Sequence, residues 1–290
     1  MPLPTRKRYK LTLAYDGSGF FGWAKQHPPG EAPLRTVQGE VEGTLRRILR
    51  PTPAEAGPGK LNLMGASRTD AGVHADGQVA TFDAATYLDL VSLHRTLRAS
   101  LPDDVDCRAA EVVPDDFNVI GDAVAKQYRY RLLLGPAAPE ACGLPPDWKP
   151  GDGHRVKPLR QRNQVTPVEE PLDLELMHEA AADFLGEHDF AAFAAAGHNR
   201  QSTVRTITDC RLEEHFALPG GPELHLVVSG GGFLYKMIRI VVGTLVDIGR
   251  GRMRYDAVRH ALFDPQRSNG GTTFPPNGLC LEWIKHRDPA

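Results

Sequence analysis

The feature that most constrains the fold of this chain is an order of strands and helices that occurs twice. In the first half, Tyr9–Tyr15 alternates between two faces as a β-strand does. A helical spacing follows, which puts Val37, Val41 and Leu45 on one side of a helix. Further strands and a second helix complete this half, and we expect it to span 1–135 as an α+β unit.

The second half, 172–290, repeats the plan after a segment of different character. Residues 136–171 are rich in proline and glycine and have few periodic apolar positions, which predicts a crossover or an insertion. We then expect a helix over 174–185 that ends at Gly186, strands over 203–216 and 223–229, helices over 234–248 and 255–263, and a last strand over 279–284. Helices would cover one face of each mostly antiparallel sheet and leave the opposite faces free to line a cleft.

Composition supports a globular protein and excludes a membrane-spanning one. Of the 290 residues, 41% are apolar and 24% are charged. No uninterrupted apolar run approaches the about 18–20 residues that cross a bilayer. The net charge is −2, but the charges are uneven: acids dominate over 103–122 and bases over 233–259. Phosphate binding needs a local positive face rather than a positive total, so a polyanionic partner stays open beside an ordinary solvated surface.

The cysteines and histidines do not predict a metal site. Cys107, Cys142, Cys210 and Cys280 are far apart with no C-x-x-C pair, which argues against both a zinc site and a disulfide framework. The histidines are scattered without metal-ligand spacing. The basic N-terminus runs into a strand with no hydrophobic signal region behind it, so we expect a reducing, cytoplasmic setting.

A glycine motif directly after the first strand raises the question of a dinucleotide site. Gly17–Gly22 fits G-x-G-x-x-G, but the helix that a Rossmann unit requires is broken by His27-Pro28-Pro29-Gly30. The motif therefore predicts a tight, hairpin-like turn beside the cleft, and an NAD-dependent oxidoreductase is the weakest of the competing functions.

The most informative segment for chemistry is the one around Asp70. It lies between two expected strands, so Asp70 would sit on a loop with rigid flanks. Arg68 can keep a neighbouring carboxylate ionised, and an ionised carboxylate is a competent nucleophile or base. From spacing alone, however, an Arg–Asp turn is structural more often than catalytic.

A second candidate segment is the strand that contains Tyr128 and Tyr130 on one face and Arg129 and Arg131 on the other. Aromatic rings interleaved with guanidinium groups are typical of surfaces that stack bases and hold phosphates. The alternative is a buried aromatic face with solvated arginines. We also expect an amphipathic helix from Phe233.

Taken together, these segments closely resemble the TruA family of tRNA pseudouridine synthases. The likeness covers nearly the whole chain and rests on ordered matches: Tyr15-Asp16-Gly17 with Gly22-Trp23, Thr36-Val37-Gln38, Arg68-Thr69-Asp70-Ala71-Gly72-Val73-His74-Ala75, Lys126-x-Tyr128-Arg129-Tyr130, Gly186-x-His188-Asp189-Phe190, Phe233-x-x-x-Met237-x-Arg239 and Gly278-Leu279-x-Leu281. The arginine–threonine–aspartate signature is the most specific of them.

The resemblance implies isomerisation of uridine to pseudouridine in tRNA, usually at positions 38 to 40 of the anticodon stem-loop. It implies two α+β halves joined around a central cleft, a homodimer, and no cofactor or metal. It assigns Asp70 as the essential carboxylate, Arg68 as its partner near the extruded base and Tyr128 as the ring that stacks on uracil. The remaining substrate-binding residues that it suggests are Arg205, Arg239 and Leu279.

Two departures from the family pattern bear on the substrate. Where the family commonly reads Phe-His-Ala-Arg, this chain has Phe117-Asn118-Val119-Ile120, and Phe274 is bulkier than the usual small residue. The first change removes a charged and a titratable side chain. It keeps two alternatives open: a synthase with a shifted target position, and a non-catalytic tRNA-binding protein.

Overall fold

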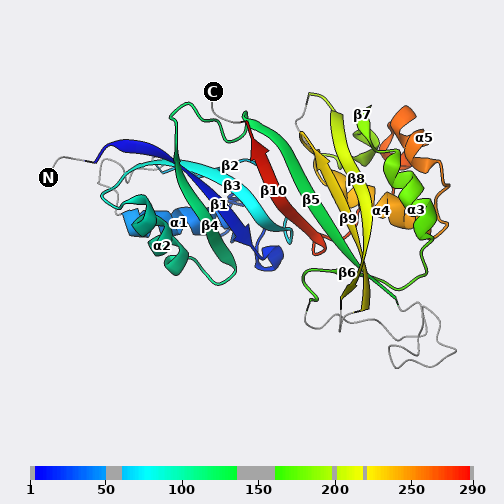
Figure 1. Ribbon diagram of the computed structural model, residues 1–290, viewed down its shortest axis with the longest axis horizontal. Coiled ribbons are helices and arrows are strands. Elements are labelled where there is room, and N and C mark those ends of the chain that lie inside the picture. The colour runs from blue at the N-terminus through cyan, green and yellow to red at the C-terminus, as the bar shows by residue number, and fades with distance from the viewer. Residues whose placement is uncertain (1–3, 50–60, 136–160, 198–200, 218–220, 288–290) are drawn as a thin grey trace. The chain divides into compact units, whose positions relative to one another are not determined.

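The computed structural model describes residues 4–49, 61–135, 161–197, 201–217 and 221–287 (Figure 1). Most of the expected 136–171 crossover lies outside these residues. The chain divides into two compact units: unit 1 comprises 1–124 and 281–290, and unit 2 comprises 125–280. Among the described helices, none is both long and apolar enough to cross a bilayer.

Unit 1 is built on a sheet with the strand order β4-β1-β3-β10. In it β1 pairs antiparallel with β3 and β4, and the short β2 pairs antiparallel with β3. Its elements are β1 (Arg6–Tyr15), the 3₁₀ turn η1 (Gly17–Gly19), α1 (Val37–Leu49), β2 (Met64–Gly65), β3 (His74–Ala85), α2 (Leu90–Ser100) and β4 (Val105–Val113), with most of β10 (Leu279–His286).

The alternation in β1 has the expected result. Tyr9, Leu11 and Leu13 are buried, and so are Val37 and Leu45 of α1. Helix α2 begins where the Asp89 carboxylate accepts a hydrogen bond from the Ser92 N–H at 2.8 Å, which satisfies one of the free donors of the first turn. The α+β character of the sequence prediction is confirmed.

Unit 2 has a sheet in the order β5-β9-β8-β7, and β6 pairs with β5 in parallel. Its elements are β5 (Ala123–Leu134), β6 (Thr166–Val168), α3 (Leu174–Ala182), β7 (Gly186–Asp189), the 3₁₀ turn η3 (Ala191–Phe193), β8 (Val204–Ala217), β9 (Gly221–Gly230), α4 (Met237–Gly249), α5 (Ala257–Phe263) and the 3₁₀ turn η4 (Arg267–Asn269).

Two helix predictions in unit 2 were wrong in detail. Helix α3 ends at Ala182 rather than near 185, and Gly186, with φ 105°, opens β7 instead of closing the helix. Helix α4 begins at Met237 because Lys236 adopts a left-handed conformation with φ 58°. Helix α4 is buried on almost all sides rather than amphipathic, and Arg239 is its one residue that is not buried. Helix α3 packs against α4 and covers part of its surface.

Candidate active site

Asp70 lies in the loop between β2 and β3, as the sequence predicts. Its side chain is half-buried, whereas Arg68 is exposed and Thr69 is buried. The carboxylate is thus carried by a loop whose neighbouring residue belongs to the core of unit 1. A carboxylate in this position can meet a ligand without being free to move far.

The residue before Asp70 is fixed by contacts from both its backbone and its side chain. The Thr69 hydroxyl and the Tyr15 hydroxyl are 2.8 Å apart in a buried hydrogen bond. The Thr69 carbonyl accepts a hydrogen bond from the Trp23 N–H at 3.1 Å. Tyr15 ends β1, so the sheet itself determines where Thr69, and therefore Asp70, is held.

The glycines of the G-x-G-x-x-G motif serve this loop. Gly22 has φ 94°, and a Cβ atom there would lie 2.7 Å from the Thr69 carbonyl oxygen. A Cβ atom on Gly17 would lie 2.0 Å from the Val73 carbonyl oxygen. The Gly72 N–H donates to the Phe20 carbonyl at 3.2 Å. The motif therefore lets one loop approach the other closely, and the predicted tight turn is the 3₁₀ turn η1.

His74 takes part in the same packing. It is buried, and its Nδ1 accepts a hydrogen bond from the Gly17 N–H at 3.1 Å. The Asp16 carboxylate lies 3.3 Å from the same nitrogen. Burial raises the pKa of Asp16, but hydrogen bonds from Ser18 outweigh that effect and leave it below its usual value. These contacts assign His74 to holding the loop.

The departure at Asn118 is a capped turn that packs beneath the same loop. The Asn118 side-chain oxygen accepts hydrogen bonds from the Ile120 and Gly121 N–H groups at 3.1 and 2.9 Å. Val119 is buried against Ala66, which begins the Asp70 loop. In this chain the segment therefore supports the loop through an apolar contact.

In unit 2, Tyr128 and Tyr130 both lie on the buried face of β5. Tyr128 is 6% exposed and meets Phe233 edge-on at 5.3 Å between ring centroids. The Tyr130 hydroxyl contacts the Thr166 hydroxyl and the Pro275 carbonyl, each at 2.7 Å. Burial raises the pKa of Tyr130 well above its ordinary value. The burial of both rings agrees with one of the two interpretations of this strand, and it leaves 6% of Tyr128 exposed.

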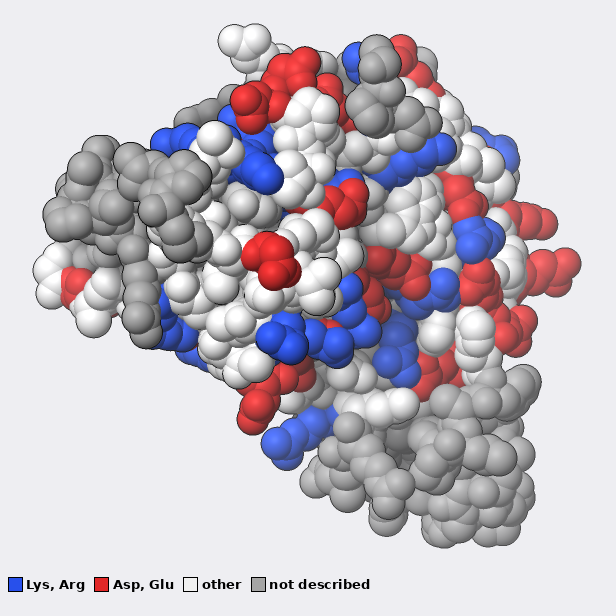
Figure 2. Space-filling view, turned by 60° about the vertical axis from the view of Figure 1, so that its left-hand side comes forward, with Lys and Arg blue, Asp and Glu red and all other residues white. Residues whose placement is uncertain are grey.

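The arginines on the other face of β5 are ion-paired. Arg129 lies 2.6 Å from Glu213, and Arg131 forms two hydrogen bonds with Glu223 at 3.0 and 3.1 Å. Basic side chains elsewhere in unit 2 are also paired with acidic ones. Bases from the basic 233–259 stretch pair with acids elsewhere, as Arg250 does with Glu170. Figure 2 shows positive and negative side chains interspersed on the visible face.

The other predicted substrate-binding residues of unit 2 fall at distinct places. The Arg239 Nε donates to the Phe274 carbonyl at 2.6 Å, and the Phe274 ring packs on Tyr130 at 6.1 Å. Leu279 is buried where β10 begins. The half-buried Arg205, on β8, donates to the Ser202 carbonyl at 3.1 Å. Within unit 2, Arg239 and the bulky Phe274 therefore belong to one packed group around Tyr130, while Asp70 and Arg68 belong to unit 1.

Sequence reasoning missed two kinds of contact here. Tyr15 was placed on the correct face of its strand, but no local signal ties it to Thr69, which is 54 positions away. Glu213, His215 and His225 come within reach of one another although their spacing fits no metal motif. The first contact comes from packing of the β2–β3 loop against the end of β1, and the second comes from pairing between β8 and β9. One sequence reveals neither.

Comparison with known proteins assigns the family. A family model described as tRNA pseudouridine synthase matches residues 180–285. A tRNA pseudouridine synthase A from Geobacter sp. (strain M21) is 39% identical over 276 residues, which cover 95% of this chain and 97% of the relative. One from Limosilactobacillus fermentum is 39% identical over 287 residues, covering 98% and 97%. The tRNA pseudouridine synthase A 2 of Clostridium perfringens is 34% identical over 278 residues, covering 96% and 99%. The chain therefore belongs to the TruA family of tRNA pseudouridine synthases, which are isomerases.

Proposed function

We propose that this enzyme isomerises uridine in the anticodon stem-loop of tRNA, at positions 38 to 40, and that Asp70 is its essential carboxylate. The observation that carries the proposal is the placement of Asp70. It is half-buried on a loop that Tyr15 and Trp23 hold through Thr69, inside the arginine–threonine–aspartate signature.

The chemistry requires no group beyond such a carboxylate. The N1–C1′ bond of uridine breaks, the detached uracil turns, and a C5–C1′ bond forms. The proton lost from C5 is balanced by one gained at N1, so the reaction is redox-neutral. Asp70 would either attack C1′ or assist removal of a proton from the ribose, and both roles need the ionised form.

The target base has to leave its stack before it can react. Extrusion costs a few kcal/mol, and contact with an aromatic ring returns about 1–3 kcal/mol. We assign that contact to Tyr128, whose ring orientation is set by Phe233. With only 6% of Tyr128 exposed, uracil would meet the part of the ring left open. The exposed Arg68 would fill the vacated space or hold a phosphate.

The remaining assignments rest on the same proposal, that this chain isomerises uridine in tRNA with Asp70. Arg205, Arg239 and Leu279 would complete the uracil and ribose pocket. The two units would be similar halves joined around a central cleft, with helices on the outer faces, and the enzyme would act as a homodimer in the cytoplasm without a cofactor. A mass measurement in solution tests the dimer.

The decisive experiment replaces Asp70 by Asn, which keeps the shape of the side chain and removes its charge. Release of tritium from C5-labelled uridine in tRNA measures turnover, and filter binding measures affinity for tRNA. Asp70→Asn should abolish tritium release and leave binding largely intact. Asp103→Asn, at an exposed turn of the same unit, is the matched control. Substantial turnover by Asp70→Asn would refute the assignment.

A shifted target position is the second candidate, and the Asn118 turn favours it. That turn replaces a charged and a titratable side chain with Asn118, Val119 and Ile120, and Ile120 is 57% exposed. Mapping pseudouridine in tRNA after deletion of the gene distinguishes the two. Loss at positions 38 to 40 supports the first proposal, and loss elsewhere supports the second.

A further inference from the structure

A Glu-x-His pair occurs on each of two neighbouring strands of unit 2. Glu213 and His215 lie on β8, and Glu223 and His225 lie on β9. Residues two apart on a strand share a face of the sheet. In the antiparallel register Glu213 is opposite His225, and His215 is opposite Glu223. The four side chains therefore form a square of alternating carboxylates and imidazoles on one face.

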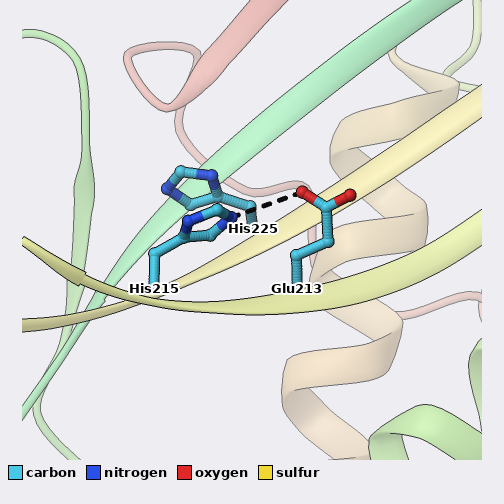
Figure 3. A group of neighbouring side chains, drawn as sticks. All are labelled: Glu213, His215 and His225. Atoms are coloured by element: carbon cyan, nitrogen blue, oxygen red, sulfur yellow. Dashed lines mark hydrogen bonds and ion pairs between the residues drawn. The ribbon is translucent and has the colours of Figure 1, made fainter.

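Three of these side chains converge, as Figure 3 shows. The His215 and His225 rings are stacked, with centroids 4.1 Å apart and planes 28° apart. His215 Nε2 lies 3.3 Å from Glu213 Oε2. One potential ligand atom from each of Glu213, His215 and His225 lies within 4.8 Å of the others.

The fourth residue, Glu223, orients His225. Its carboxylate is buried and lies 2.7 Å from His225 Nε2, and Arg131 holds it from the other side. An ionised carboxylate only accepts hydrogen bonds, so Nε2 carries the proton and Nδ1 keeps its lone pair. A carboxylate that fixes the histidine tautomer in this way is the usual outer partner of a metal-bound histidine.

His225 Nδ1 and Glu213 Oε2 already contact one and the same cation. Arg129 Nη1 donates to Glu213 Oε2 at 2.6 Å and to His225 Nδ1 at 3.2 Å. Arg211 binds the other oxygen of Glu213, Oε1, at 3.0 Å. Thus Glu213 Oε2 and His225 Nδ1 share a single positively charged neighbour, which is carried on a long and flexible side chain.

We propose that Glu213, His215 and His225 form a binding site for a divalent transition metal such as Zn²⁺, which takes the place of the Arg129 guanidinium. Two imidazoles and one carboxylate suit Zn²⁺ or Co²⁺ and do not suit Mg²⁺, which prefers oxygen ligands. Ligand distances would be about 2.0–2.2 Å. The Glu213 and His215 side chains are 28% and 46% exposed, so they can rotate. Such rotation would bring the ligand atoms, now within 4.8 Å of one another, to bonding distance from one ion.

The bound ion would tie β8 to β9. Because it would bind the folded pair of strands and not the separated ones, it would raise the stability of unit 2, and above its Kd this gain would grow with the logarithm of its free concentration. This role is independent of the isomerisation and of the residues proposed for it.

The test uses the full-length, tag-free chain after treatment with a chelator. Titration with Co²⁺ should give visible absorption bands of a tetrahedral or five-coordinate site, and Zn²⁺ should raise the melting temperature while Mg²⁺ does not. The double variant His215→Ala/His225→Ala should lose both signals. His260→Ala, at an exposed position on α5, is the matched control and should keep them. Equal binding by the double variant and the wild type would show adventitious binding only and overturn the proposal.

Two further variants test the arrangement itself. Glu223→Gln leaves the three ligands in place and should weaken Co²⁺ binding by about 10–100-fold. Arg129→Leu removes the competing cation and should tighten Co²⁺ binding. Weaker or unchanged Co²⁺ binding by a folded Arg129→Leu protein would contradict the proposal that the metal takes the place of the Arg129 guanidinium. If that variant does not fold, Arg129→Lys replaces it. Its shorter and more mobile cation should compete less with the metal, so Co²⁺ binding should again be tighter than in the wild type.

Discussion

Each unit contains a buried hydrogen bond between a tyrosine and a threonine hydroxyl, and the two differ in what they hold. In unit 1, Tyr15 contacts Thr69 at 2.8 Å. In unit 2, Tyr130 contacts Thr166 at 2.7 Å. Thr69 precedes Asp70 on a loop, whereas Thr166 begins β6, which is already paired with β5.

The difference lies in what else fixes each threonine. Around Thr69 the restraints are close backbone approaches, which depend on glycine at Gly22 and on a few hydrogen bonds. Around Tyr130 they are sheet pairing and the packing of Phe274. The same chemical contact therefore positions the loop of the proposed catalytic residue in one unit and reinforces a core in the other. We expect substitutions around Thr69 to affect turnover and those around Tyr130 to affect mainly stability.

Among the substitutions that test this comparison, Gly22→Ala is expected to have the largest effect. A left-handed alanine costs about 1–2 kcal/mol, and its Cβ would also press on the Thr69 carbonyl. If Asp70 is the catalytic carboxylate, displacing it by about 1 Å would lower kcat by about 100-fold. The tritium-release assay measures kcat, and circular dichroism confirms that the variant is folded. Gly30→Ala is the control, because Gly30 also has positive φ but nothing within 4 Å of an added Cβ. Equal kcat values in the two variants would contradict the positioning role of Gly22.

Tyr15→Phe should have the next largest effect. It removes the hydroxyl that bonds the Thr69 hydroxyl and keeps the ring, at a cost of about 1–3 kcal/mol for a buried polar group that loses its partner. If about 1.4 kcal/mol of this appears in the transition state, kcat falls about tenfold. Steady-state kinetics with tRNA measure it, and an unchanged kcat would mean that Asp70 is placed without this bond.

Tyr130→Phe is the matched substitution in unit 2 and should lower kcat less than Tyr15→Phe does. It removes the hydroxyl that contacts Thr166 and Pro275, and we expect the free energy of unfolding to fall by about 1–2 kcal/mol. Urea unfolding measures this change. A larger loss of kcat than in Tyr15→Phe would reverse the comparison.

The smallest effect is expected at the end of β3 remote from the loop, where Arg8 pairs with Asp83 at 2.8 Å. The Arg8 guanidinium holds the pKa of Asp83 below its usual value of 3.8, against the opposing effect of burial. The ionised form is thus favoured in the folded state, and its contribution is present above about pH 3.8 and lost as the pH falls through the lower, folded pKa.

Arg8→Met should therefore lower stability at pH 7 by up to about 1 kcal/mol, with no change in kcat. The part of the difference that comes from the ion pair should vanish at acidic pH, while the part that comes from the Arg8 hydrogen bonds to the Asp115 and Phe117 carbonyls should remain. Urea unfolding between pH 7 and pH 3 measures it. A difference that grows toward low pH would show that the pair does not act through ionised Asp83.

The sequence predicted the elements that depend on short-range pattern. Alternation located β1 and the buried faces of Tyr9 and Leu11, and helical spacing located α1. The end of α3 and the start of α4 were misplaced. Helix α3 stops at Ala182 although Asp183 is still right-handed, and α4 begins after a left-handed Lys236; neither feature has a strong local sequence signal.

For the site, the sequence by itself determined that Asp70 stands on a loop between strands and that the chain resembles the TruA family. Residue order and local periodicity suffice for that. Only the tertiary structure decided that Tyr15 holds Thr69, that the glycine motif packs against the Asp70 loop, and that Glu213 meets His225. Those contacts depend on strand register and on close backbone approach between distant segments, and neither is encoded in the spacing of neighbouring residues.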